Sequence, residues 1–414
     1  NETLFRIIDK NVRVPDKVAG DFRAQISACE LGERGFQDLG RQYGLDRLET
    51  LFDHLLDYTE ELTRQAISRL QDGQWEFADH IDNDGFTNDP VPIRVRIKKA
   101  GDTITADYTG TSPQVKGAIN STLSYTSSIT YACVKSVLGV DIPNNAGFFR
   151  PINIVAPEGS FVNPQLPAPV AARGLAAMRI TETLFGAFAK MLPDKIFACG
   201  VGLDTGVTIA GYFADRRPFL FLEFMYVSWG GGPDRDGIDG ASLPHSNYSN
   251  TPVEVIEAEQ PMMIDCYGFV PDRCGAGKFR GGLAFQRHYR LLADEADLQL
   301  RSDRQKYLPY GLHGGQSGKP SISQMNRNDG DLEILPSKGL FQMQRGNVFH
   351  HITAGAAGWG DPLDRDVNNI LEDVVNEKLS PEYVRREYSV VVERNSDGIT
   401  WEINFAETEQ LRQR

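Results

Sequence analysis

The stretch from Pro271 to Leu283 (PDRCGAGKFRGGL) combines four glycines with basic side chains, directly after an apolar run. A glycine-rich backbone can reach positive φ and can approach a ligand or another segment closely. Exposed amides beside guanidinium groups can form a nest for an anion or a carbonyl oxygen. The residues alone favour a simpler interpretation, a tight connection between two strands whose arginines are solvated or bond nearby carbonyls. The segment is not a phosphate loop, because the pattern Gly-x-x-x-x-Gly-Lys-Ser/Thr does not occur.

The stretch from Ser242 to Glu257 (SLPHSNYSNTPVEVIE) is a second candidate site. Amide and hydroxyl side chains can fix a small polar ligand, and a carboxylate can act as a general base. Spacing alone favours a polar loop that leads into a strand. The side chains that would carry the chemistry are His245, Asn247, Asn250, Thr251, Glu254 and Glu257.

Metal-ligand patterns are weak in this sequence. His80, Asp82, Asp84 and Asp89 lie within ten residues, but they lack the fixed glycine and terminal glutamate of a calcium loop. A turn rich in Asp and Asn is the default interpretation. The adjacent pair at 350–351 reads as part of a strand, where neighbouring side chains point to opposite faces. We therefore predict no metal ligands among these residues.

The composition describes a globular protein rather than a nucleic-acid or membrane protein. Of 414 residues, 41% are apolar and 24% are charged, as in soluble domains. The net charge of −13 argues against a nucleic acid or an anionic membrane as partner. No apolar run is long enough to span a bilayer. The five cysteines include no C-x-x-C pair, which fits free thiols in a reducing cytoplasm, and Cys274 is interpreted as inert.

Hydrophobic periodicity predicts a mixed α/β fold with helices at both ends. From Asp46 to Gly73 the apolar residues recur at helical spacing, which is typical of a core-facing helix. Residues 93–108 alternate and turn at Gly101-Asp102, which predicts a hairpin with one solvated face. Short strands and glycine turns dominate further on, with 311–319 among the expected strands. Ser380-Pro381-Glu382 is a helix start signal.

These patterns divide the chain into four regions. We predict a helical region at 1–74 and an α/β region at 75–196, with a hairpin and two helices. A strand-rich region with glycine loops follows at 197–362, and a helical region closes the chain at 363–414. The first residue is Asn1 rather than Met, within what reads as an amphipathic helix. We therefore expect the sequence to be a piece of a longer protein or a processed form.

Taken together and in order, several segments give the chain a clear resemblance. They resemble the hydantoinase B/oxoprolinase family, which comprises B-type subunits or domains of ATP-dependent N-methylhydantoinases and 5-oxoprolinases. Related subunits occur in the ketone carboxylases for acetone and acetophenone. The resemblance covers essentially the whole chain, and its most specific parts are GAGKFRGG and NTPVEVIE. The segments are GDFRAQISA, DYTGTSPQVKGAIN, NNAGFFRPINIVAPEGSFVNP, SNTPVEVIE, GAGKFRGGL and GWGDPLDRD.

The resemblance implies a division of labour between two subunits. A partner A-type subunit, of an actin-like ATPase type, binds ATP and activates the substrate oxygen as a phosphate ester. The B-type subunit then directs water onto a cyclic amide, or forms a carbon–carbon bond with carboxyphosphate or CO₂. Activation is needed because a lactam or ketone oxygen is a poor leaving group until it is phosphorylated.

With this chemistry in view, we predict catalytic roles for three residues. Glu254 would act as a base, while Arg273 and Arg280 would hold an enol phosphate or an oxyanion. The predicted substrate-binding residues are Asn120, Asn250, Thr251, Gly275, Gly277, Gly281 and Gly282.

Two departures from the family pattern limit how far the family's functional residues can be assigned to this sequence. Family members normally begin earlier, with a histidine- and aspartate-rich metal-binding segment that nothing in this sequence matches. We therefore expect a divalent metal whose ligands lie outside these residues, and an N-terminal segment of the B-type subunit as a partner. Second, the segment at 355–360 reads GAAGWG, where the family usually has a glycine run, and alanine restricts positive φ.

The sequence thus supports one leading hypothesis and two alternatives. The leading one is the B-type subunit of a cytoplasmic, ATP-dependent cyclic-amide hydrolase that acts on a small molecule in a hetero-oligomer. The first alternative is a subunit of an ATP-dependent ketone carboxylase. The second is a scaffold that docks the ATPase while the chemistry occurs elsewhere.

Overall fold

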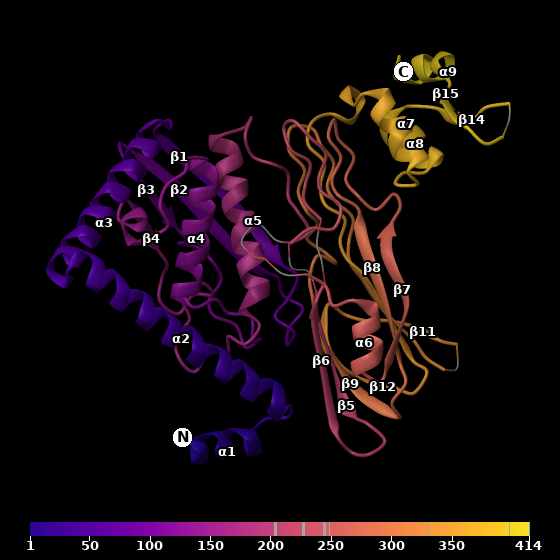
Figure 1. The fold of residues 1–414 in the computed structure, drawn as a ribbon. Coiled ribbons are helices and arrows are strands. Elements are labelled where there is room, and N and C mark those ends of the chain that lie inside the picture. Colours follow the sequence, from indigo (N-terminus) through magenta and orange to yellow (C-terminus); the bar gives the residue numbers. More distant parts are fainter. Residues whose placement is uncertain are drawn as a thin grey trace.

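The computed structural model describes residues 1–202, 205–225, 228–242, 246–247, 249–328, 330–396 and 398–413. Figure 1 shows helices and a small sheet on one side, a long strand-rich part on the other, and further helices at the C-terminal end. The predicted mixed α/β fold, helical at both ends, is confirmed. Among the described residues, no helix is long and apolar enough to cross a membrane.

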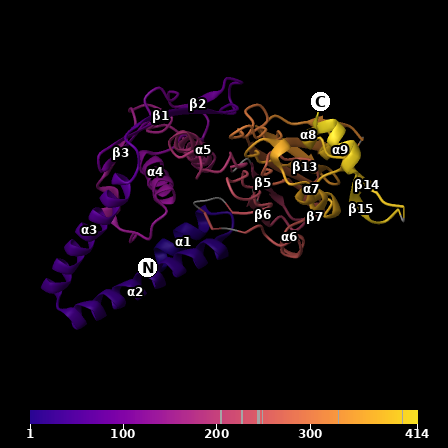
Figure 2. The same cartoon turned by 90° about the horizontal axis from the view of Figure 1, so that it is seen from above.

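Three helices open the chain and form an arm. They are α1 (Glu2–Asn11), α2 (Pro15–Tyr43) and α3 (Leu45–Ser68). Pro15 stands in the first turn of α2, where its missing N–H is not needed. Gly44, at φ 80°, separates α2 from α3. Figure 2 shows the two long helices diverging from this corner as the sides of a V. Helix α3 packs mainly through its C-terminal half, at Thr59, Thr63 and Ile67, although Leu48 near its start is also buried.

A four-stranded sheet backs these helices in the order β1-β2-β3-β4. The predicted hairpin is confirmed: β2 and β3 are antiparallel, and Gly101 adopts φ 58° in the turn. The side chains of β2 alternate between buried and exposed, as expected for one solvated face. Helix α5 packs across β1 and β2 and is buried along nearly its whole length. The elements are β1 (Gly73–Ile81), β2 (Val91–Ala100), β3 (Thr103–Asp107), β4 (Ile152–Val155), α4 (Leu123–Leu138), η1 (Ala146–Phe149) and α5 (Arg173–Met191).

The strand-rich part is a sandwich of two mainly antiparallel sheets. One sheet has the order β12-β9-β5-β6 and the other β11-β10-β13-β8-β7. Apolar side chains from both sheets form one core, which includes Val207, Leu298, Tyr289 and Phe349. The elements are β5 (Thr205–Tyr212), β6 (Pro218–Phe224), α6 (Val253–Glu259), β7 (Met262–Val270), β8 (Ala284–Leu291), β9 (Glu295–Ser302), β10 (Ile322–Asn326), β11 (Leu332–Ile334), β12 (Lys338–Gln344) and β13 (Val348–Ile352).

The C-terminal part packs on the glycine-rich end of the sandwich. Helix α8 begins where predicted, and the Ser380 hydroxyl accepts a hydrogen bond from the Tyr383 amide. Its core joins Val384 and Ile370 to Cys274 and Leu283 of the glycine-rich stretch. The elements are η2 (Pro362–Asp364), α7 (Val367–Val375), α8 (Pro381–Tyr388), β14 (Val392–Arg394), β15 (Trp401–Ile403) and α9 (Phe405–Arg412).

The main hydrophobic cores do not coincide with the four predicted regions, so they do not fix the boundaries between those regions. The first core contains residues of β1–β4, α4 and α5, but also Val201, Ala354 and Ala356 from the region predicted to begin at 197. The boundaries at 74, 196 and 362 therefore stay predictions. One expected strand is wrong: residues 311–319 form no regular strand, only isolated bridges at Leu312 and Lys319.

The glycine-rich stretch lies inside a layer of closely packed backbone segments. A Cβ atom added at Gly281 would lie 2.0 Å from the carbonyl oxygen of Ala356, and one at Gly275 would lie 2.4 Å from that of Gln316. The close approach expected from glycine is confirmed. None of the four glycines uses the positive φ open to it, and the residue of this stretch with positive φ is Asp272, at 64°. These positions are glycine because neighbouring backbone leaves no room for a side chain.

Gly281→Ala should therefore destabilise the protein strongly. The methyl group would overlap a carbonyl in a rigid layer, and overpacking of this kind costs about 1–3 kcal/mol or more. Gly268→Ala is the matched control, because a Cβ atom at Gly268 meets nothing within 4 Å. Urea denaturation of both variants measures the difference. Equal stabilities would contradict the packing explanation.

Candidate functional site

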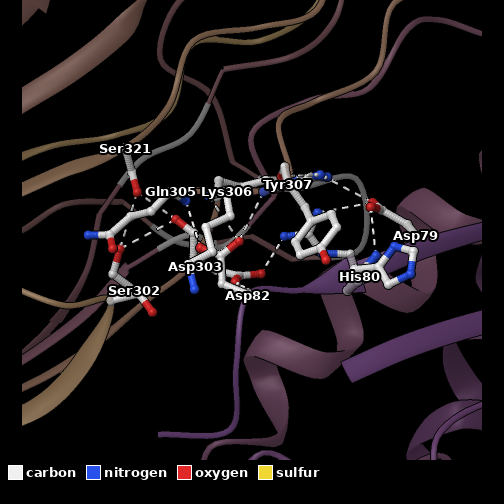
Figure 3. A network of polar contacts seen from close by, with 12 residues as sticks. Asp79, His80, Asp82, Ser302, Asp303, Gln305, Lys306, Tyr307 and Ser321 are labelled. Atoms are coloured by element: carbon white, nitrogen blue, oxygen red, sulfur yellow. Dashed lines mark hydrogen bonds and ion pairs between the residues drawn. The ribbon is translucent and has the colours of Figure 1, made fainter. Parts of the chain in front are cut away.

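Charged side chains that are rarely buried meet where α5 and β1 join the sandwich. Arg179 of α5 donates to Asp79 of β1 over 3.0 Å and also to Asp303, which follows β9. Arg304 donates to the same Asp79 oxygen over 3.2 Å. All four residues are buried. We call Asp79, Arg179, Asp303 and Arg304, with Glu182, Cys199, Asp82 and Lys338 around them, the junction cluster; Figure 3 shows part of it.

Asp82 fixes the loop that carries half of this cluster. Its carboxylate accepts hydrogen bonds from the amides of Gln305, Lys306 and Tyr307 over 2.7, 3.2 and 3.1 Å (Figure 3). Asp84 likewise accepts from amides of its own turn, at Phe86 and Thr87. The default interpretation of the acidic segment at 80–89, a turn, agrees with these contacts. Within the part of the chain that the structure describes, no three potential ligands are grouped to hold a metal.

Helix α5 carries two charged side chains, which is unusual for a helix that is buried along nearly its whole length. Every residue from Leu175 to Ala189 is buried, including Arg179 and Glu182. These two are three positions apart and therefore lie on the same side of the helix. Both line a narrow crevice together with Arg304 and Asp303. A buried helix keeps such residues only if their charges are compensated.

Glu182 is the carboxyl of the junction cluster whose charge has no matching cationic side chain. Arg179, Arg304 and Lys338 face three aspartates, so the charges already balance without Glu182. Burial raises the pKa of Glu182 from 4.5 to about 7, although the nearby Arg304 opposes the shift. Burial also lowers the pKa of Lys338. A carboxyl that titrates near neutral pH in a cluster of charges is a functional-site candidate.

This pKa shift predicts a pH dependence of stability that Glu182→Gln should remove. Because the folded-state pKa lies above the unfolded value, the folded protein binds more protons between pH 4.5 and 7. The stabilisation is fully present below about pH 4.5 and is lost as the pH rises through about 7. The difference in free energy of unfolding between wild type and Glu182→Gln should fall by up to roughly 3 kcal/mol over this range. Urea titrations from pH 4.5 to 8 measure it, and a constant difference would contradict a raised pKa.

Cys199 lies beside the same groups as a neutral thiol. Its sulfur accepts a hydrogen bond from Arg304 over 2.9 Å. Burial raises the pKa of Cys199 well above its ordinary value, so the thiolate is disfavoured. Cys274 is also buried and its pKa is raised to about 11 by burial, in line with the interpretation of an inert thiol.

A second buried polar group lies inside the sandwich. The carboxylate of Glu223 on β6 accepts two hydrogen bonds from Arg287 on β8, over 2.6 and 2.7 Å. It also accepts from the side-chain amide of Asn250 and the backbone amide of Thr251, each over 3.2 Å. The structure thus brings two predicted substrate-binding residues together on one buried carboxylate.

The other predicted residues of that loop lie apart or outside the described residues. Glu254 is exposed in the first turn of α6 and is not among the partners of Glu223. His245 lies outside the residues that the structure describes. Asn120 is buried and bonds the carbonyls of Val115, Gly117 and Pro169, which closes its own loop. The catalytic role of Glu254 and the binding role of Asn120 stay predictions.

Arg280 is held in ion pairs rather than exposed to a cleft. It donates to Asp239 over 3.0 and 3.1 Å and to Asp373 of α7 over 3.1 Å. Arg365 shares Asp373 and also binds Asp236. These contacts tie the 230–240 loop, the glycine-rich stretch and α7 together. These ion pairs hold the Arg280 side chain in place, and its predicted catalytic role stays a prediction.

Arg273 and the glycine amides are likewise occupied within the chain. Arg273 donates to the carbonyl of Pro320. The amides of Gly275, Gly281 and Gly282 donate to carbonyls of Ala356, Gly275 and Trp229. An anion nest would need these amides to be open, so the binding roles of Arg273 and the glycines stay predictions.

A cavity of about 470 Å³ lies between the end of α4 and the 229–238 loop. Phe197 and Trp229 line it, with ring centroids 5.6 Å apart and planes at 25°. Lys195 and Arg235 also line it. Its size suits a small molecule. Gly200 lies between Trp229 of this cavity and Glu182 of the junction cluster. A Cβ atom added at Gly200 would lie 3.6 Å from Trp229 Cα and 3.3 Å from Glu182 Oε1.

The sequence interpretation missed the junction cluster entirely. Arg179 and Glu182 did carry a signal, because they interrupt an otherwise apolar and small-residue helix three positions apart. Their direct ion-pair partners Asp79 and Asp303 come from β1 and from the loop after β9, 100 and 124 positions from Arg179. Nothing in local spacing connects them.

Comparison with known proteins gives consistent matches. The sequence profile described as Hydantoinase B/oxoprolinase matches residues 1–362. The chain is 32% identical to a putative B-type subunit of a D-/L-hydantoinase from Pseudomonas sp. (strain NS671), over 100% of this chain and 70% of that protein. The crystal structure of ATP-dependent caprolactamase from Pseudomonas jessenii superposes with a TM-score of 0.88 at 24% identity, covering 100% of this chain and 72% of that one. An acetone carboxylase structure superposes with a TM-score of 0.89 at 15% identity, covering 100% and 62%.

Proposed function

Because the chain belongs to the hydantoinase B/oxoprolinase family, we propose that it is the B-type subunit of an ATP-dependent cyclic-amide hydrolase. A partner A-type subunit would bind ATP and activate the amide oxygen. The relative at 32% identity is named a hydantoinase subunit, whereas the carboxylase resembles this chain at 15%. The closer sequence relationship favours hydrolysis over carboxylation.

The observation that carries the proposal is Glu182, a buried carboxyl whose pKa is raised to about 7 beside buried arginines. In hydrolysis of the O-phosphorylated amide, the oxygen of water bonds to the amide carbon, the C–N bond breaks to leave an acyl phosphate, and a second water then releases inorganic phosphate. A base takes a proton from the attacking water and returns it to the departing ring nitrogen. Such a base works best when its pKa lies near the working pH. We assign this role to Glu182.

Arg179 and Arg304 suit the negative charge that develops on the oxygen of the attacking water as it loses its proton. Both are fixed by Asp79 and line the same crevice as Glu182. Fixed cationic donors in a site that excludes water stabilise an oxyanion without reorganising. The two arginines are therefore proposed to stabilise the transition state of water attack.

The 470 Å³ cavity is the proposed entry site for the ring of the substrate. A flat cyclic amide can stack on Trp229, and Lys195 and Arg235 at the same cavity can attract the phosphate of the activated species. Trp229→Ala should therefore raise KM about tenfold or more with a smaller change in kcat. Steady-state kinetics of the complex measure this. A loss confined to kcat would contradict a role in binding.

The described residues do not fit a metal site of this chain's own, since no suitable group of ligands is present among them. The proposed steps therefore use only the side chains named above, and we expect the divalent ion of the family to be held by residues beyond those described. ATP would be bound by the partner subunit.

Reconstitution with an A-type subunit tests the function. The complex should consume ATP only with a cyclic amide such as hydantoin, 5-oxoproline or caprolactam, and should release the ring-opened product without bicarbonate. A strict requirement for bicarbonate with a ketone substrate would replace hydrolysis by carboxylation. Full turnover by a complex carrying Glu182→Gln would instead favour the scaffold alternative.

A further inference from the structure

Helix α2 is unusual because almost nothing in the chain covers it. Every residue from Gly20 to Leu39 is exposed, and Ala19 is the one buried residue described for this helix. Its side-chain contacts to other elements are few: Lys17 pairs with Glu259 over 2.8 Å, Arg23 lies over the Phe5 ring of α1 at 5.9 Å, and Phe36 stacks on Phe52 of α3 at 6.3 Å. Long helices owe most of their stability in water to packing of an apolar face. This helix therefore lacks its packing partner.

The exposed residues form an apolar surface rather than a solvated one. Figure 2 shows α2 and the N-terminal part of α3 standing away from the strands, with the corner of the V far from the rest of the chain. Four side chains recur at seven-residue intervals, the spacing of a helix–helix seam: Phe22, Cys29, Phe36 and Tyr43. We define the arm surface as the exposed apolar residues of both helices. They are Phe22, Ile26, Phe36, Leu39, Tyr43, Leu45, Leu51, Phe52, Leu55 and Tyr58, while the exposed Leu31 faces the other way and is not included.

The area of the arm surface is that of a stable interface. Its side chains are between 38% and 66% exposed. A large side chain can bury about 150–250 Å², so these half-exposed side chains together present roughly 1,000 Å² of accessible area. A standard interface buries about 800 Å² on each partner. Gly32 and Gly35 of α2 also indicate that a partner packs against this helix. Each costs a helix about 1 kcal/mol relative to Ala, and a Cβ atom at either would meet nothing within 4 Å in this chain.

The lengths of the relatives indicate what covers this surface. The whole of this chain, including the arm, matches only 70% of the hydantoinase subunit and 72% of the caprolactamase chain. Nearly a third of each relative therefore lies beyond the matched region. We propose that the arm surface is the docking site for a polypeptide equivalent to that third, which packs its own apolar helices into the V between α2 and α3. This inference rests on exposure and length, not on the proposed activity.

The reactivity of the Cys29 thiol reports directly whether the arm surface is covered. It is exposed within the seven-residue series of α2, whereas the other cysteines are buried or, for Cys266, half-buried on β7. Covering the arm surface should protect its thiol from a maleimide reagent. Ile26 is three positions from Cys29 and shares its side of the helix, while Leu31 lies on the opposite side. Ile26→Asp and Leu31→Asp therefore form a matched pair of exposed apolar-to-charged variants.

The experiment co-expresses this chain with the unmatched third of the Pseudomonas sp. (strain NS671) hydantoinase subunit as a separate polypeptide. We expect a 1:1 complex in sedimentation, at least tenfold slower labelling of Cys29, loss of both with Ile26→Asp, and retention with Leu31→Asp. A complex in which Cys29 labels at the free rate would overturn the proposal. So would the absence of a complex, or a self-associated chain whose dimer is lost with Ile26→Asp, since the occupant would then be a second copy.

Discussion

Glu182→Gln is expected to lower turnover of the assembled, ATP-supplied complex by about 10²–10⁴-fold, the usual contribution of a positioned general base. Glutamine has the same shape and can keep the contacts of the protonated carboxyl, but it cannot accept a proton. The junction cluster stays balanced without the Glu182 charge, so the fold should persist. Steady-state kinetics with a cyclic amide and circular dichroism on the same samples measure the two properties separately.

The pH profile separates this role from a structural one. With wild type, kcat/KM should rise as the pH passes about 7, where Glu182 loses its proton. The residual activity of Glu182→Gln should lack this limb. Thr183→Ser is a mild control, because the neighbouring hydroxyl bonds the Arg179 carbonyl within the same helix. If Glu182→Gln keeps the limb near pH 7, another group is the base.

Arg280→Ala is expected to produce the largest loss of stability, about 3–5 kcal/mol. Removing one partner of a buried ion pair leaves its carboxylates uncompensated. Asp239 is the clearest case: burial alone would raise its pKa, but the hydrogen bonds and charge of Arg280 outweigh burial and lower it. Without Arg280, Asp239 would keep only Lys378 and Asp373 would keep only Arg365, which Asp236 also shares, so the three aspartates would have one cation too few. Urea denaturation at pH 7.5 measures the loss.

The control for Arg280 is an arginine of the same loop region that is exposed. Arg235 has a side chain that is 78% exposed, and its replacement by alanine should change stability by less than about 0.5 kcal/mol. Arg280→Lys should recover part of the loss, because lysine keeps the charge but not the planar fork. If Arg280→Ala unfolds at the same urea concentration as wild type and loses only turnover, the catalytic role predicted for Arg280 from the sequence would be the better explanation.

Much of the local structure follows from the sequence alone. The period of two at 93–108 predicts the β2–β3 hairpin, because alternate side chains must face one core. The signal at Ser380-Pro381 predicts the start of α8, since proline and a capping hydroxyl satisfy the first turn. The ordered segments from GDFRAQISA to GWGDPLDRD also identify the family, which the profile match over residues 1–362 confirms. These features depend on neighbours in the chain, so the sequence carries them.

Only the tertiary structure decided which residues meet and what the glycines do. Asp79, Arg179 and Asp303 come from three distant segments, and no local period links them. The glycine-rich stretch could equally have opened an anion nest or packed against backbone. A carbonyl oxygen 2.0 Å from the position that a Cβ atom would take at Gly281 selects packing in this structure. The exposure of α2 is also decided at this level, because an amphipathic pattern specifies a face to be covered but not the partner that covers it.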